Sequence, residues 1–299
     1  MEKMEKSDYL KNQVNLALPE GKNFLVWLTH DVDRVYKTFF HALYYGFKEK
    51  KGSHLKSFFQ GGNPYWNFEK IMELESQFGV RSTFFFLNET MKASISRPYS
   101  FVLAKGRYKI EDPKIQEMMK KLDEGGWEIG VHGSFHSYNN GDLLAREKET
   151  LEKILRHSIS GIRQHHLNLE IPTTWSLQQS IGFQYDFSFG SNTENGYRDS
   201  IYYPFRPFKD DFVVFPLVIM DAVLFSSSTA EEAWNQCCRY MDFAQEKKTI
   251  LSILWHQRVF NESDFSGYQE IYERFITECQ KRNAQFCTGN DIFNYIDKS

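Results

Sequence analysis

Two carboxylates follow the first apolar run of the chain. Residues 24–28, FLVWL, have the composition of a buried strand, and the sequence continues as THDVDR, with Asp31 and Asp33 two residues apart. In extended backbone both side chains point the same way, so both can reach one small site. A carboxylate can bind a divalent metal or, beside a metal-bound water, act as a general base. Turn or cap roles explain either residue equally well when it is considered alone.

A pair of histidines suggests further ligands for such a metal. His132 and His136, in HGSFH, are four residues apart, which on one helical turn places both imidazoles on the same side. Gly133 stands where the H-E-x-x-H signature of metalloproteases needs Glu, and this excludes that signature. Histidines without a ligand role are the commoner explanation of the spacing alone. Two imidazoles and one carboxylate are, however, a frequent ligand set for a catalytic divalent ion.

Two later runs could support the carboxylates. Arg163, in GIRQHHL, could hold a nearby base ionised and oriented, although a structural ion pair is an equal alternative. His165 and His166 in the same run could add polar contacts to a substrate, or face helix and core in turn. His256 ends the run ILSILWH and could protonate a leaving amine, or could simply end the strand.

The elements that must position these groups alternate along the chain. Strands are predicted at 24–28, 82–87, 127–131, 161–167, 183–189, 212–220 and 249–255. Helices are predicted at 68–78, 112–123, 142–155, 230–245 and 268–281. This alternation predicts an α/β fold with a largely parallel sheet covered by helices, either open or closed into a barrel. In both forms the carboxyl ends of the strands bring reactive groups to one rim.

The chain reads as one domain. We find no internal repeat, no low-complexity tract and no flexible linker, so residues 21–299 are predicted to form a single catalytic domain after an extension at 1–20. Residues 36–63, aromatic and basic, and residues 190–211, rich in Asn, Tyr and Pro, interrupt the alternation. Both are expected to lie over the face of the sheet, where substrate contacts are common.

Composition limits the possible partners and compartments. Of the 299 residues, 41% are hydrophobic and 25% charged, and the net charge of -3 gives no footprint for nucleic acid or an anionic membrane. The polar N-terminus has no signal-peptide pattern, and no apolar run is long enough to span a bilayer. The four cysteines lack C-x-x-C spacing and are expected to be free thiols. A cytoplasmic protein is therefore expected.

The combination of motifs resembles the polysaccharide deacetylase family, carbohydrate esterase family 4, also called the NodB-homology domain. The resemblance rests on four features in order. They are D-x-D at Asp31 and Asp33, H-x-x-x-H at 132–136, Arg163 on the next strand, and a terminal strand ending in Leu-x-His at His256. It covers residues 24–295, and the combination is far more specific than any one motif.

This resemblance implies a distorted (β/α)7 barrel that uses a divalent metal, with zinc the expected ion, to remove N-acetyl groups from an amino-sugar saccharide. It implies that Asp31 is the catalytic base and that Asp33, His132 and His136 are the metal ligands. Arg163 then steadies the base and His256 is the general acid. Three further residues are expected around the substrate. Trp255 would form a wall of the acetyl pocket, His165 would contact the substrate, and Asp221 would orient His256.

The sequence departs from the family pattern at two points, which concern the substrate more than the chemistry. Val32 separates the two aspartates, which are adjacent in the commonest form, and RQHHL lacks the Pro and Gly that usually follow the arginine. A small cyclic amide or ureide therefore stays an alternative substrate, and a saccharide-binding barrel without catalysis stays an alternative function. Non-haem iron oxygenases share the ligand set, but they do not account for Asp31, Arg163 and His256.

Overall fold

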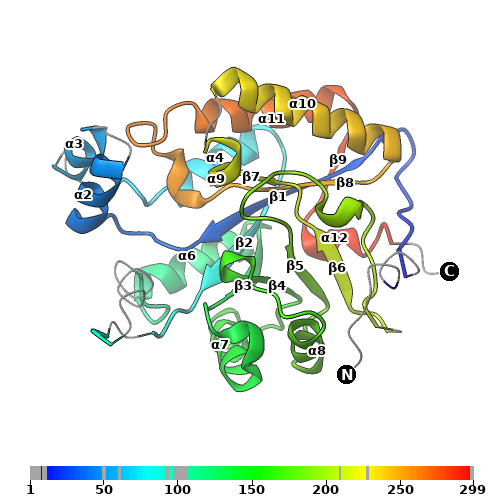
Figure 1. Cartoon of the computed structure of the whole chain (residues 1–299), viewed down its shortest axis with the longest axis horizontal. Helices are drawn as coiled ribbons and strands as arrows, with labels where there is room; N and C mark the ends of the chain where they lie inside the picture. The colour runs from blue at the N-terminus through cyan, green and yellow to red at the C-terminus, as the bar shows by residue number, and fades with distance from the viewer. Residues whose placement is uncertain are drawn as a thin grey trace.

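The computed structural model describes residue 8 and residues 12–48, 52–59, 62–91, 94–96, 107–208, 210–226 and 229–296. A parallel sheet curls around a central axis, and helices cover its outside (Figure 1). The strands follow the order β6-β5-β4-β3-β2-β1-β8-β7, and β9 also pairs with β1. They are β1 (Leu25–Val32), β2 (Thr83–Leu87), β3 (Glu128–Gly133), β4 (Gly161–Gln164), β5 (Tyr185–Phe189), β6 (Val213–Pro216), β7 (Ile219–Met220), β8 (Ile250–Leu254) and β9 (Gln285–Phe286).

One segment joins the two edges of this sheet. β6 pairs with β5 and β7 pairs with β8, yet only Leu217 and Val218 separate β6 from β7. The amide of Leu217 donates to the Phe189 carbonyl at 2.9 Å, and the amide of Val218 donates to Ser252 Oγ at 3.1 Å. The predicted strand 212–220 is therefore one stave of the barrel, that is, one strand position in its wall, formed by two short strands. When β6 and β7 are counted as one stave and the short β9 is left out, the described residues form seven staves of a distorted (β/α) barrel, as predicted.

The strands have two buried faces, as expected for a parallel sheet inside a shell of helices. On β1, Leu25 and Trp27 belong to the core inside the barrel, whereas Val26 and Leu28 belong to the core under the helices. The Trp27 ring stacks on Phe187 at 4.2 Å inside the barrel. Because side chains alternate along a strand, Asp31 continues the inward series.

The helices pack on the outer faces of the strands, with α10 and α11 on one side and α7 and α8 on the other (Figure 1). Several begin at clear caps, such as the capping box of Thr229 and Glu232 before α10. The helices are α2 (Phe39–Lys48), α3 (Ser53–Phe59), α4 (Phe68–Gln77), α6 (Pro113–Glu124), α7 (Gly141–Leu155), α8 (Thr173–Ser180), α9 (Asp221–Leu224), α10 (Ala230–Lys247), α11 (Tyr268–Lys281) and α12 (Gly289–Ile292). Short 3-10 turns are η1 (Ser137–Asn139), η2 (His165–Leu167), η3 (Arg198–Ser200) and η4 (Gln257–Phe260).

The described part of the predicted N-terminal extension contacts the barrel. Val14 is buried in the inner core, and Leu16 forms a bridge with Ile296. Residues 1–7 and 9–11 of the extension lie outside the described residues. Among the helices described, none combines the length and apolar character that crossing a bilayer requires.

Candidate active site

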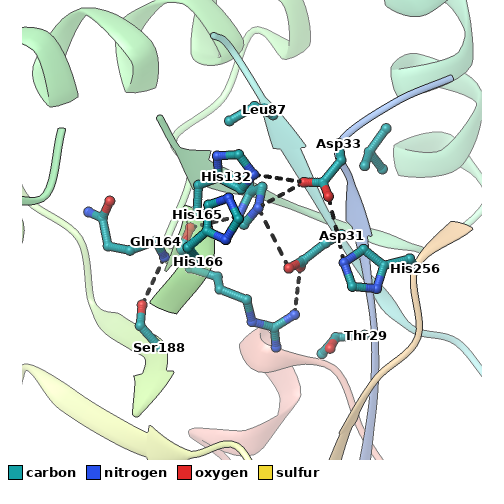
Figure 2. A network of polar contacts seen from close by, with 12 residues as sticks. Thr29, Asp31, Asp33, Leu87, His132, Gln164, His165, His166, Ser188 and His256 are labelled. Carbon is teal, nitrogen blue, oxygen red and sulfur yellow. Dashed lines mark hydrogen bonds and ion pairs between the residues drawn. The ribbon is translucent and has the colours of Figure 1, made fainter. Parts of the chain in front are cut away.

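A pocket of about 330 Å³ opens where β1, β3, β4 and β8 end. Inward-facing residues at the ends of parallel strands come close together because neighbouring strands are only about 5 Å apart. Figure 2 shows that the polar side chains of this rim converge on Asp31 and Asp33. The pocket is lined by Asp31, Asp33, His132, His165, His166, Leu167, Asn192, Met220, Ala222, Leu254, His256 and Arg258.

Three of these residues could hold a metal ion. Asp33, His132 and His165 each offer one ligand atom, and these atoms all lie within 4.8 Å of one another. Asp33 Oδ1 lies 3.2 Å from His132 Nε2 and 3.6 Å from His165 Nε2 (Figure 2). One carboxylate and two imidazoles are a common ligand set for a catalytic divalent ion.

The hydrogen bonding of the two rings fits this use. His132 Nδ1 lies 2.9 Å from the Arg163 carbonyl, which can only accept, so Nδ1 donates to it and Nε2 is the ring nitrogen that faces the site. His132 Nε2 and Asp33 Oδ1 are both buried without a hydrogen-bond partner. Arg107 Nη2 donates to His165 Nε2 at 3.2 Å, so the His165 nitrogen carries a lone pair. The set therefore fits a divalent metal, with Arg107 beside one ligand atom.

The structure does not bring His136 into this group. β3 continues to Gly133 and a turn follows, so residues 132–136 do not form the helical turn on which the four-residue spacing was interpreted. His136 precedes η1, and its ring lies 5.1 Å from the ring of Phe135. His165, which was expected at the substrate, takes the third position. It begins the turn η2 directly after β4, and its ring packs 5.2 Å from that of His132.

Asp31 lies beside the metal-ligand group, as the sequence predicts. Its Oδ1 accepts from Arg163 Nη1 at 2.7 Å, and its Oδ2 lies 3.6 Å from His132 Nε2. The Arg163 guanidinium is fully buried between the rings of Phe85 and Phe187, each 4.5 Å away. Burial lowers the pKa of Arg163. Arginine nevertheless stays charged in proteins, so it holds Asp31 as an oriented carboxylate.

His256 lines the pocket and forms a pair with the buried Asp221. The amide of His256 donates to Asp221 Oδ2 at 2.8 Å, and its Nδ1 lies 2.7 Å from Asp221 Oδ1. Nδ1 therefore carries a proton, and Nε2 faces Asp33 Oδ2 at 3.6 Å (Figure 2). Burial would raise the pKa of Asp221, but the charge of His256 outweighs burial and lowers it. Asp221 is fully buried, which suits an orienting group and not a substrate contact.

Trp255 does not wall the pocket. Because Leu254 and His256 face inward, Trp255 between them faces the helices, where it is fully buried. Its ring packs 5.6 Å from that of Tyr272 and 6.0 Å from that of Phe225. The apolar residues that line the pocket are Leu167, Met220, Ala222 and Leu254.

Two arginines at this site were not predicted from the sequence. Arg258 Nη1 lies 3.2 Å from Asp33 Oδ2, and Arg107 Nη1 donates to the Asp33 carbonyl at 2.9 Å. Arg258 has a signal in hindsight, because it lies two residues after His256. Arg107 follows no strand of the described chain, and the sequence carries no comparable signal for it.

Charges control protonation at the metal-ligand group. Burial alone would raise the pKa of Asp33, but its contact with His132 and the charge of His165 hold it well below the usual range. Burial would lower the pKa of His132, but Asp31 and Asp33 raise it. Burial keeps the pKa of His165 well below its usual value. His165 is therefore neutral and Asp33 ionised at neutral pH, the states that a metal ligand needs.

The similarities to known proteins are structural. No family model matches the sequence, and no curated protein matches it. Among solved structures, a protein from Mycobacterium smegmatis described as a polysaccharide deacetylase aligns with 17% identity, over 95% of this chain and 93% of that one, with a TM-score of 0.62.

Two further structures differ in what they do. The Puue allantoinase aligns with 13% identity, over 93% of this chain and 91% of that one, with a TM-score of 0.60. A mutant of a pseudoenzyme of carbohydrate esterase family 4, with restored enzymatic activity, aligns with 10% identity, over 92% and 68%, with a TM-score of 0.51. At these identities the similarity shows the fold alone, the distorted (β/α) barrel that polysaccharide deacetylases also have.

Proposed function

We propose that the chain is a metal-dependent hydrolase of an amide C–N bond, and that it removes the N-acetyl group from an amino-sugar-containing saccharide. One observation carries the proposal. A single pocket contains a possible ligand set of Asp33, His132 and His165. The same pocket contains the separate carboxylate of Asp31 and the ring of His256, which Asp221 orients.

The ligand set has a distinct role in this proposal. Asp33, His132 and His165 would hold a divalent ion, for which zinc is the first candidate from the nitrogen and oxygen donors. Such an ion, when bound, polarises a carbonyl oxygen and lowers the pKa of its water towards neutrality. The protein residues then divide the proton transfers between them.

Asp31 is the proposed general base. Its carboxylate is next to the ligand group but is fixed by Arg163 at 2.7 Å, so one oxygen is committed to the guanidinium and the other faces the pocket. It takes the proton from the attacking water. The salt bridge prevents the carboxylate from turning away from the pocket.

His256 is the proposed general acid. With Nδ1–H directed at Asp221, the ring presents Nε2 to the pocket, and Nε2 carries the transferable proton in the proposed mechanism. That proton goes to the departing amine, which would leave poorly as an anion.

Fewer observations support the proposed substrate class. The apolar residues that line the pocket suit an acetyl methyl group, and Asn192 and His166 offer polar contacts. A cyclic amide or ureide is the second candidate, because one similar structure is an allantoinase and the same groups would open such a ring. A saccharide-binding barrel without catalysis is the third, and a pseudoenzyme is among the similar structures.

One experiment separates these candidates. Purified protein loaded with Zn²⁺ is incubated with a panel of N-acetylated saccharides and a panel of cyclic ureides, with and without a chelator. We expect acetate release that the chelator abolishes and added Zn²⁺ restores. Ring opening of a ureide without acetate release would favour the second candidate. Saccharide binding without turnover of either panel would overturn the enzymatic proposal.

A further inference from the structure

The exposed phenylalanines of the described chain gather on one helical hairpin. We define the α2–α3 hairpin as residues 39–59; it follows β1 at the rim where the active site lies. Phe40 is 63% exposed, Phe47 76% and Phe59 70%, and Phe39 is 44% exposed. Among the described residues, the only other large hydrophobic side chain with such exposure is Ile95. Figure 1 shows the hairpin projecting from one end of the barrel.

The side of the hairpin that faces the barrel is fixed by a buried polar cluster. The Lys37 ammonium pairs with Asp264 and donates to Ser57 Oγ at 2.6 Å, and Ser57 Oγ donates to Asp264 Oδ1 at 2.7 Å. His54 Nδ1 lies 3.5 Å from the same carboxylate oxygen. All four side chains are buried. Breaking such a network leaves an uncompensated buried charge, so the hairpin is held to the loop before α11.

The hairpin has exposed aromatic rings, and its sequence carries positive charge. The rings of Phe39 and Phe59 lie 6.4 Å apart, so α2 and α3 contribute to one aromatic surface. Residues 39–59 contain four lysines and one glutamate, a net charge of +3. The other residues of the chain hold 32 of its 36 basic and 38 of its 39 acidic residues, a net charge of -6. The hairpin is thus a basic segment on an acidic protein.

We infer that the α2–α3 hairpin docks the protein on an anionic phospholipid surface. Rings that enter the boundary between headgroups and acyl chains, with lysines beside them at the phosphates, are the pattern of interfacial amphipathic helices. A second copy of the chain fits less well, because a symmetric contact would bring two segments of the same net positive charge together. Docking would bring the rim that carries the active site to the membrane surface.

The test is co-sedimentation of the full chain with vesicles, which does not depend on enzymatic activity. We expect binding to vesicles of phosphatidylglycerol and phosphatidylcholine that is at least about tenfold stronger than to phosphatidylcholine alone. Binding should weaken as salt rises, because exposed charges are screened. The triple variant Phe40→Ser, Phe47→Ser, Phe59→Ser should lose at least about tenfold in binding.

Two controls separate docking from misfolding and from self-association. Ile95→Ser removes an exposed apolar side chain outside the hairpin and should bind vesicles as the wild type does. Circular dichroism of the triple variant should match the wild type. Failure of the wild type to bind anionic vesicles, or equal binding by the triple variant, would overturn the inference. Sedimentation as a dimer that the triple variant converts to a monomer would also overturn it, in favour of a second copy.

Discussion

Asp31 and Asp33 have different environments although only Val32 separates them: Asp31 lies on β1, and Asp33 follows its last residue. Asp31 is held by Arg163 from within the barrel, whereas Asp33 lies against His132, His165 and Arg258 at the rim. Asp31 faces inward from β1, whereas Asp33 lies in the bend that follows the strand. In the proposed mechanism the first carboxylate acts on water and the second holds the ion.

This difference predicts separable effects of two substitutions. Asp31→Asn should keep the metal and lower kcat by about 10²- to 10⁴-fold, because it removes the proton acceptor and retains the ligands. Asp33→Asn should lower metal content as well. Metal analysis of both variants, together with acetate release, checks the prediction. Loss of metal from Asp31→Asn would show that Asp31 is itself a ligand.

The third ligand can be tested in the same way. Replacing His165 with Ala should reduce metal affinity by an order of magnitude or more, because it removes one of three protein ligands. His136→Ala is the matched control and should retain metal, since the ring of His136 lies outside the group. Titration with Zn²⁺ against a competing chelator measures both affinities. The reverse order would restore the ligand pair expected from the sequence.

The sequence could predict which residues come to this rim, but it could not predict which of them contact one another there. Asp31, Asp33, His132, Arg163 and His256 are brought together because each lies at the end of an apolar run. His136 was predicted in the ligand group and His165 at the substrate, but the structure places His165 in the group, because the local backbone decides which ring reaches it. Residues after β3 form a turn, and η2 folds back directly after β4. Spacing along the chain does not distinguish these conformations.

At the scale of elements, close strand packing depends on Gly161 at the start of β4. A Cβ atom there would lie 1.9 Å from Tyr185 Cζ, and the Tyr185 hydroxyl is held by Glu128 at 2.9 Å. The ring therefore cannot turn away without breaking that bond. Gly161→Ala should reduce the free energy of unfolding by about 3 kcal/mol.

Urea denaturation measures this effect against a matched control. Gly52 is exposed in the α2–α3 hairpin, and a Cβ there meets no atom within 4 Å. Gly52→Ala should therefore change stability by less than about 0.5 kcal/mol. Equal stability of the two variants would mean that β4 and β5 can separate at little cost.

Element boundaries were predicted well where apolar runs coincide with strands, as at β2 and β8. β1 runs four residues past the predicted end at residue 28, because its polar residues are buried and paired in the sheet. Periodicity cannot detect a polar strand end of this kind. The break between β6 and β7 was missed because residues 212–220 are uniformly apolar, and only pairing with two different neighbours divides them.

At the scale of the whole molecule, two buried glutamates link stability to pH. Burial raises the pKa of Glu128 to about 7 from 4.5, against hydrogen bonds from Thr83 and Tyr185, and burial also raises the pKa of Glu147 to about 7. Between these pH values the folded chain retains protons that the unfolded chain has lost. The stabilisation of the folded state that each protonated glutamate contributes is thus complete below about pH 4.5 and is lost as pH rises through about 7.

Replacement of one glutamate should change this profile. Each shift corresponds to about 3 kcal/mol across the window, so Glu128→Gln should remove up to that amount of the decline between pH 4.5 and 7.5. Urea denaturation at several pH values measures the slope. Glu124→Gln, at an exposed position, should leave the profile unchanged. An unaltered slope in Glu128→Gln would mean that this carboxyl group is already ionised in the folded protein at low pH.

The stave that closes the barrel also completes the acid pair. Asp221 follows β7 directly, so the carboxylate that orients His256 reaches its place only when β7 has paired with β8. Asp221 follows β7 and His256 follows β8, so the two residues of the pair lie at the ends of the two strands that meet where the barrel closes. A chain in which β7 and β8 have not paired would therefore have the proposed ligand residues at β1, β3 and β4 but no aligned proton donor. Under the proposed mechanism, activity thus requires the two edges of the sheet to have joined.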